Sequence, residues 1–72
     1  MSKLGPHSGK EVVAGLGRLG FTQASQKGSQ VKMRHPDGRV AIVPMHGEVA
    51  LGTLRSILRQ AGITADELAG VL

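Results

Sequence analysis

The five residues 35–39 place the strongest constraint on how this chain can fold. Their central Pro-Asp-Gly is typical of a tight turn, because proline presets φ and the Asp-Gly pair tolerates a positive φ. Val31 and Met33 alternate with polar residues before the turn, and the apolar residues 40–43 follow it. The pattern predicts an antiparallel hairpin made of two short strands.

A second turn, Lys-Gly-Ser at residues 27–29, precedes this hairpin. The residues before that turn, 22–26, are polar and alternate only weakly, so we expect an edge or solvent-facing strand there. In the strand that follows, Gln30, Lys32 and Arg34 share one face, and the apolar residues share the other. Three antiparallel strands are therefore expected between residues 22 and 43.

Sequence patterns typical of helices occur before and after these strands. Ser8 and Glu11 have the spacing of a capping box, in which each side chain bonds the backbone N–H of the other. The apolar residues after it recur at helical spacing: Val12, Val13, Leu16 and Leu19. Gly20 followed by Phe21 is typical of a Schellman ending, so a first helix is expected to stop there.

A second helix is expected after the strands, with Thr53 or a nearby residue as its cap and Gly62 at its end. Its apolar residues are Leu54, Ile57, Leu58 and Ala61. Residues 64–67 (Thr-Ala-Asp-Glu) form a second capping box, which opens a short final helix.

The predicted order makes an α+β domain, a three-stranded antiparallel sheet with helices on one face. Residues 8–72 are expected to form this single domain, behind a disordered lead at residues 1–7. No apolar run approaches the roughly 20 residues of a membrane span, and no signal or transit segment is visible. We therefore expect a soluble cytoplasmic protein without a membrane partner.

Basic residues are concentrated toward the beginning of the chain. Residues 1–47 carry seven Lys or Arg and two carboxylates, whereas residues 48–72 carry two Lys or Arg and three carboxylates. The imbalance favours an anionic partner, either a nucleic acid or an acidic protein surface, and a solubilising surface is the alternative. The one aromatic residue, Phe21, is expected in the core, which argues against base stacking on aromatic side chains.

Three imidazoles are candidates for proton transfer near neutral pH. His7 lies in the polar lead and is interpreted as a tail residue. His35 lies at the hairpin turn, where a structural role is favoured. His46, in the loop before the second helix, could bind a phosphate or a partner, or simply face solvent. Because the chain has no cysteine and no clustered carboxylates, no metal site is predicted.

Cationic side chains could hold a phosphate backbone along the middle strand. Lys32 and Arg34 alternate on one face, Lys27 lies just before them, and the N–H groups of residues 28 and 29 (Gly-Ser) could also reach a phosphate. A solvated sheet face and an ordinary turn are the alternatives. Arg55 and Arg59 are four residues apart on the second helix, either on an exposed face or at an interface.

Several short motifs, in order along residues 8–72, resemble the HicA (YcfA-like) toxins. They are residues 9–13 (GKEVV), 19–21 (LGF), 26–29 (QKGS), 34–39 (RHPDGR), 43–46 (VPMH) and 52–63 (GTLRSILRQAGI). The resemblance implies a double-stranded-RNA-binding-domain-like α-β-β-β-α fold with a short extra C-terminal helix. It also implies an mRNA interferase, an endoribonuclease that needs no metal or other cofactor, within a type II toxin–antitoxin system. The implied partner is a HicB antitoxin that covers the active site.

The chain departs from this family at one position. The family's catalytic histidine follows Gly-Ser at the start of the second strand, where this chain carries Gln30. Glutamine cannot exchange a proton near neutral pH, and loss of a general acid or base costs about 100-fold to 10,000-fold in rate. We expect an inactive or crippled ribonuclease that still binds RNA and antitoxin.

The sequence alone leaves open several alternatives to a disabled toxin. Gln30 fits either an introduced substitution that permits production of a toxic protein or a natural degenerate toxin. The chain could also be a non-catalytic RNA-binding or antitoxin-docking module, or a structural scaffold. If position 30 has no catalytic role, His35 or His46 becomes the better candidate.

Overall fold

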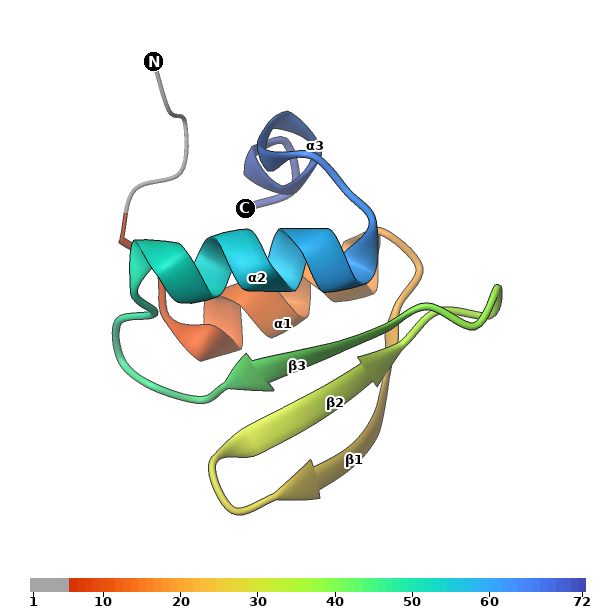
Figure 1. Ribbon diagram of the computed structural model, residues 1–72, viewed down its shortest axis with the longest axis horizontal. Helices are drawn as coiled ribbons and strands as arrows, with labels where there is room; N and C mark the ends of the chain where they lie inside the picture. The colour runs from red at the N-terminus through yellow and green to blue at the C-terminus, as the bar shows by residue number, and fades with distance from the viewer. Residues whose placement is uncertain (1–5) are drawn as a thin grey trace.

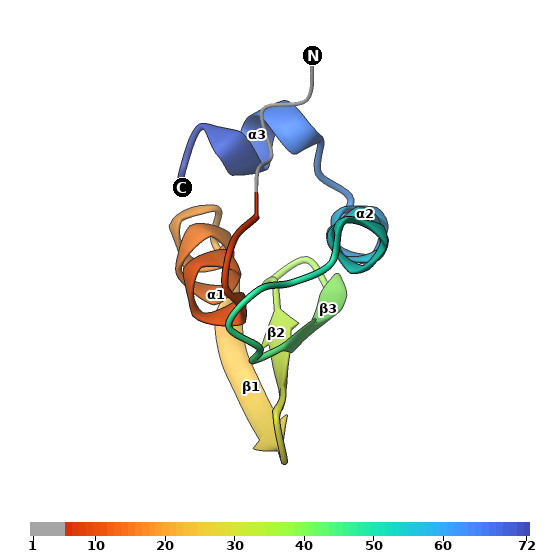
Figure 2. The same cartoon turned by 90° about the vertical axis from the view of Figure 1, so that its left-hand side faces the viewer.

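The computed structural model describes residues 6–72, which form two layers (Figure 1). Its elements are α1 (Gly9–Arg18), β1 (Thr22–Lys27), β2 (Gln30–Arg34), β3 (Val40–Pro44), α2 (Leu51–Ala61) and α3 (Ala65–Ala69). This confirms the predicted α+β class and the α-β-β-β-α order with a short extra helix. Turned by 90°, the structure places α1 and α2 on one side of the sheet, with α3 beyond them (Figure 2).

The three strands form one antiparallel sheet in the order β1-β2-β3, so β2 is the central strand. β1 pairs with β2 through a register shift between Gln23 and Ser25, which marks a β-bulge. Every residue of β1 is exposed, as expected for an edge strand. The alternation predicted for β2 is confirmed: Val31 and Met33 are buried, whereas the side chains of Gln30 and Arg34 are exposed.

The start and the end of α1 match their sequence signals. The Ser8 hydroxyl accepts a hydrogen bond from the Glu11 N–H, and the Glu11 carboxylate accepts one from the Ser8 N–H. At the other end, the N–H of Phe21 donates to the carbonyl of Leu16. Gly20 has φ +98°, so the helix ends in the predicted Schellman motif.

The prediction for the start of α2 was wrong in one detail. The helix begins at Leu51, two residues before Thr53, and its N-cap is Ala50, which has no side chain able to cap. Thr53 is the first residue after the strands with a good capping side chain, but the chain already enters the helix before reaching it. Gly62 ends α2 with φ +66°, and Thr64 and Glu67 form the second capping box, both as predicted.

One apolar core fills the space between the helices and the inner face of the sheet. Phe21 lies in it, as expected, with 3 % of its surface exposed. The other buried members are Val12, Leu16, Val31, Met33, Ala41, Val43, Val49, Leu54, Ile57, Ala61 and Leu68. The core therefore lies entirely on one side of the sheet, and no helix within residues 6–72 covers the other side (Figure 2).

The beginning of the domain is tied to the loop before α2. The predicted disordered lead falls largely on residues 1–5, which lie outside the described residues. His7, which was assigned to that lead, forms a β-bridge with Val49, whose N–H donates to the His7 carbonyl at 2.8 Å. The Gly9 N–H donates to the carbonyl of His46 at 2.9 Å. Within residues 6–72, no helix has the length and apolar character needed to cross a membrane.

Candidate functional site

The face of the sheet that points away from the helices is called the open face here. Because directly paired residues of antiparallel strands share a face, the register assigns its members. From β1 they are Thr22, Ser25 and Lys27; from β2, Gln30, Lys32 and Arg34; from β3, Val40, Ile42 and Pro44. Two of the three predicted cations of this site, Lys32 and Arg34, thus stand side by side on the central strand, with Lys27 beside Gln30.

The charge of the open face is entirely positive. None of the three strands contains an aspartate or a glutamate. The ion pairs found within residues 6–72 involve His7, His35 and Arg39, and none involves a cation of the open face. Lys27, Lys32 and Arg34 are therefore available to an anionic ligand.

Gln30 lies at one end of this face, immediately after the β1–β2 turn. It is the first residue of β2, is exposed, and pairs with Lys27 on one side and Pro44 on the other. The turn is built by Gly28 with φ +60°, whereas Ser29 has no positive φ, as in a type II′ hairpin. The Ser29 carbonyl accepts the N–H of Met45 at 2.6 Å, which extends the β2–β3 ladder by one bond.

His46 lies at the same end of the sheet as Gln30. It follows Pro44 by two residues, and the bond from Met45 to Ser29 holds its chain beside the turn. Its backbone is anchored through the carbonyl that accepts the Gly9 N–H, and its side chain is exposed. Of the two alternative histidines, His46 is therefore the one placed near position 30.

His35 lies at the opposite end of β2. It directly follows Arg34, five residues after Gln30, which is about 16 Å along an extended strand. Its ring packs edge-on against Phe21 at a centroid distance of 5.1 Å. Its Nδ1 lies 3.2 Å from the Asp37 N–H nitrogen and 3.0 Å from Asp37 Oδ1. These contacts tie His35 to the turn and to the core residue Phe21, and the distance separates it from Gln30.

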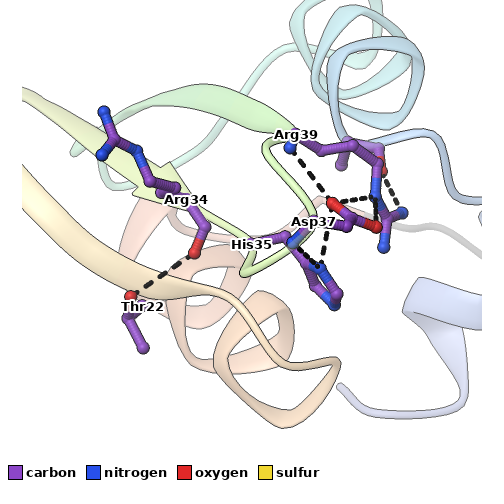
Figure 3. A network of polar contacts seen from close by, with 6 residues as sticks. Thr22, Arg34, His35, Asp37 and Arg39 are labelled. Carbon is purple, nitrogen blue, oxygen red and sulfur yellow. Dashed lines mark hydrogen bonds and ion pairs between the residues drawn. The ribbon is translucent and has the colours of Figure 1, made fainter.

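A polar network closes the turn around His35 (Figure 3). Arg39 Nε donates to both carboxylate oxygens of Asp37, at 3.0 and 2.8 Å, and its guanidinium lies 5.3 Å from the Phe21 ring centre. Arg39 also donates to the carbonyl of Ala61 at 2.6 Å, which joins the turn to the end of α2. The backbone N–H of Arg39, followed by its guanidinium, lowers the pKa of Asp37 below its usual range. Figure 3 shows the side chain of Arg34 pointing away from this network.

His7 and the two arginines of α2 lie outside the open face. The His7 ring is 3.3 Å from the Glu11 carboxylate at the start of α1. Hydrogen bonds from the Ser8 N–H, and then from His7, lower the pKa of Glu11 below its usual range. Arg55 and Arg59 are exposed on α2, which borders the sheet at β3. No group of three potential metal ligands was found within residues 6–72.

The structure adds residues that the sequence did not single out. Val40, Ile42 and Pro44 are partly exposed on the open face, where Val40 and Ile42 lie next to the cations of β2 and Pro44 next to Gln30. Gln60 of α2 accepts the N–H of Ile42 at 3.0 Å through its side-chain oxygen. Residues 40–44 are all apolar, so the sequence does not show which of them face the helices, and only the pairing with β2 assigns them to a face.

Comparison with known proteins adds one finding to this geometry. A sequence model of the family described as "HicA toxin of bacterial toxin-antitoxin" matches residues 9–63, well over half of the chain. The match runs from the first residue of α1 to just beyond α2, so it contains the whole sheet, and α3 lies outside it. A search of curated proteins found no match.

Proposed function

Because this chain belongs to the HicA toxin family of bacterial toxin–antitoxin systems, we propose that it is a toxin subunit with the scaffold of an mRNA interferase. In this proposal the open face binds RNA in the cytoplasm, and catalysis is disabled at Gln30. A HicB-like antitoxin binds the same face and masks it. The endoribonuclease scaffold is metal-independent and needs no cofactor.

The observation that carries the proposal is the place of Gln30. Cleavage of RNA without a metal requires a group that accepts the proton of the attacking 2′-hydroxyl. Position 30 is exposed at the end of a positively charged face, next to Lys27 and the Gly28–Ser29 turn. Its amide can form hydrogen bonds but cannot take up a proton near neutral pH. The position therefore suits a catalytic base, and its present side chain cannot serve as one.

The cations of the open face supply the binding part of the function. Lys32 and Arg34 project from the central strand, and Lys27 lies next to position 30. Charge-assisted hydrogen bonds to phosphate oxygens are the strong contacts in nucleic-acid binding, and they position the strand without reading its sequence. The same positive charge suits an antitoxin surface that carries carboxylates.

The test is to place a histidine at position 30 and to measure RNA cleavage and growth arrest. We expect Gln30→His to cleave RNA at least about 100-fold faster than the unchanged chain. Gln30→Asn is the matched control, since it keeps an amide and should remain inactive. If the unchanged chain already cleaves as fast as Gln30→His, the proposal of a disabled site is wrong.

The same assay tests the remaining imidazole at this end of the sheet. Should the unchanged chain cleave RNA, His46→Ala would be expected to abolish that activity, because His46 lies beside the Gly28–Ser29 turn. His35→Ala, about 16 Å further along β2, serves as the distant comparison. Loss of cleavage with His35→Ala and not with His46→Ala would contradict the assignment.

A non-catalytic binding module is the second candidate function, and Gln30 itself favours it. A chain that has lost its proton acceptor retains the means to bind if it keeps three cations on one face, and these three have no ion-pair partner in the part of the chain that the structure describes. The salt dependence of the affinity distinguishes a module that binds RNA from one that docks to an antitoxin. A steep loss of affinity with rising salt indicates phosphate contacts, whereas tight binding to an antitoxin with little salt dependence indicates protein docking.

A further inference from the structure

The outer side chains of β3 differ from those of the other two strands. On β1 and β2 the open face carries hydroxyl, amide or charged groups, as is usual for the wet side of an antiparallel sheet. On β3 it carries Val40, Ile42 and Pro44, which are called the apolar row. All three are partly exposed, whereas the inward residues Ala41 and Val43 are fully buried.

The apolar row runs parallel to the cations of β2. Ile42 pairs directly with Lys32, and Val40 pairs directly with Arg34. Neighbouring strands lie about 4.8 Å apart, and alternate residues of one strand about 6.6 Å apart. The open face therefore has a positive row and an apolar row side by side, with a step along each row close to the phosphate repeat of an extended nucleic-acid strand.

The apolar row does not serve as an edge for another strand. The outward N–H of Ile42 already donates to the side-chain oxygen of Gln60, at 3.0 Å. Pro44 has no N–H to offer. A partner strand could not form a regular ladder along β3, so the surface that β3 presents is its side chains.

We propose that the apolar row contacts the bases of an unpaired RNA strand whose phosphates lie on Lys32 and Arg34. This inference rests on the proposed function, because it takes RNA binding by the open face as given. It adds which part of the RNA, the phosphates or the bases, each row contacts. A single strand exposes phosphates on one side and bases on the other, which matches the two rows. A duplex turns its bases inward and would leave the apolar row without a partner.

The chemistry of the apolar row also determines how strongly it can distinguish one RNA sequence from another. The only aromatic residue, Phe21, is buried in the core, so the bases meet aliphatic side chains rather than a stacking ring. Val40, Ile42 and Pro44 present no hydrogen-bonding group from their side chains. The inference is therefore that the apolar row favours unpaired over paired RNA with little preference among the four bases.

The experiment measures the affinity of the full chain for short RNA that carries 2′-O-methyl groups, which cannot be cleaved through the 2′-oxygen. Three probes are compared: a mixed-sequence single strand, the same length of backbone without bases, and the corresponding duplex. Ile42→Thr is the main variant, since it keeps a β-branched side chain and so suits the strand. Lys32→Gln tests the positive row, and Leu51→Thr is the matched apolar control, because Leu51 is 47 % exposed and lies on α2, outside the open face.

We expect Ile42→Thr to weaken binding of the single strand about fivefold, through loss of apolar contact, and to leave binding of the base-free backbone unchanged. Lys32→Gln should weaken the binding of both probes, and Leu51→Thr should change the binding of neither. The duplex should bind more weakly than the single strand. Thermal unfolding of each variant checks that the fold is kept.

Three results would overturn the inference and leave the proposed function standing. The first is an equal loss for Ile42→Thr on RNA with and without bases, and the second is a duplex that binds as tightly as the single strand. The third is an affinity of Ile42→Thr for the single strand equal to that of the unchanged chain. If the chain binds none of the three probes even at low salt, the RNA-binding part of the proposed function itself fails.

Discussion

The helical side of the sheet and its open face use polar side chains in opposite ways. On the helical side, polar groups satisfy the backbone: capping boxes start α1 and α3, and Arg39 bonds the end of α2. On the open face, Lys32 and Arg34 have no ion-pair partner within residues 6–72. One side is arranged to hold the chain together, and the other leaves its charges for a ligand.

This division predicts that stability and binding can be changed separately. Variants on the helical side and at its turns should change the free energy of unfolding and leave the affinity for RNA of the folded protein unchanged. Variants on the open face should do the reverse. The four predictions below test this separation, from the largest expected effect to the smallest.

Gly9→Ala should cause the largest change, a loss of about 3 kcal/mol in the free energy of unfolding. Gly9 is buried at the start of α1, where an added Cβ would collide with the carbonyl oxygen of Pro44 and come within 2.8 Å of the Cα of Met45. Both neighbours are backbone atoms, which cannot rotate away. Urea unfolding measures the change.

Gly17→Ala is the matched control on the same helix. An added Cβ there meets no atom within 4 Å, and Gly17 is exposed, so alanine should stabilise α1 by about 1 kcal/mol. If the two substitutions have the same effect on unfolding, close packing of α1 on the loop after β3 does not hold the helical side together.

The double variant Lys32→Gln and Arg34→Gln should weaken RNA binding by about 30-fold at low salt, or about 2 kcal/mol, as two charged contacts are lost. The slope of log affinity against log salt should fall in magnitude by about 1.4, since each phosphate contact to a single strand contributes about 0.7. Unfolding by urea should change little. Filter binding or fluorescence anisotropy at several salt concentrations gives both numbers.

The control for overall charge is Arg55→Gln with Arg59→Gln, which removes the same charge from α2. It should lower RNA affinity only slightly and leave the salt slope near that of the unchanged chain. An equal loss from both double variants would mean that net charge, rather than the open face, governs binding.

The division between the helical side and the open face also explains which features the sequence could predict. Both capping boxes and the Schellman ending depend on residues three to five positions apart, so the local sequence is sufficient. The start of α2 at Leu51 was missed because Ala50 provides no capping side chain, so no local signal marks this helix boundary. The apolar row and the bond from Ile42 to Gln60 depend on pairing between distant segments, which periodicity alone does not reveal.

For the candidate site, alternation was enough to place Gln30, Lys32 and Arg34 on one face, because β2 is a regular strand. It was not enough to rank His35 and His46. Both follow a strand directly or within two residues, but they lie at opposite ends of the sheet, and only the antiparallel pairing shows which one is near position 30.

Arg39→Lys should lower the free energy of unfolding by about 1 kcal/mol and leave RNA affinity unchanged. Lysine cannot reproduce the paired bonds to Asp37, the bond to the Ala61 carbonyl and the contact with the Phe21 ring at once. Arg59→Lys, on the exposed side of α2, is the control and should change stability by less than about 0.5 kcal/mol. A loss of RNA affinity with Arg39→Lys would extend the binding surface to the turn after β2.

The smallest expected effect is a loss of stability in acid that arises from the turn and the first helix. Hydrogen bonds lower the pKa of Asp37 and of Glu11, in each case first through a backbone N–H, of Arg39 and of Ser8 respectively. A folded-state pKa below the unfolded value means that the unfolded chain takes up the proton first as the pH falls. The stabilisation is therefore complete above the unfolded pKa and disappears as the pH drops through the folded pKa.

Asp37→Asn and Glu11→Gln should each reduce the slope of stability against pH on the acid side, as measured by urea unfolding between neutral and strongly acidic pH. The strands of the open face contain no carboxylate, so the acid loss should come from the helical side and its turns alone. An acid slope that survives in the combined Asp37→Asn and Glu11→Gln variant would contradict the assignment of the acid loss to these two carboxylates.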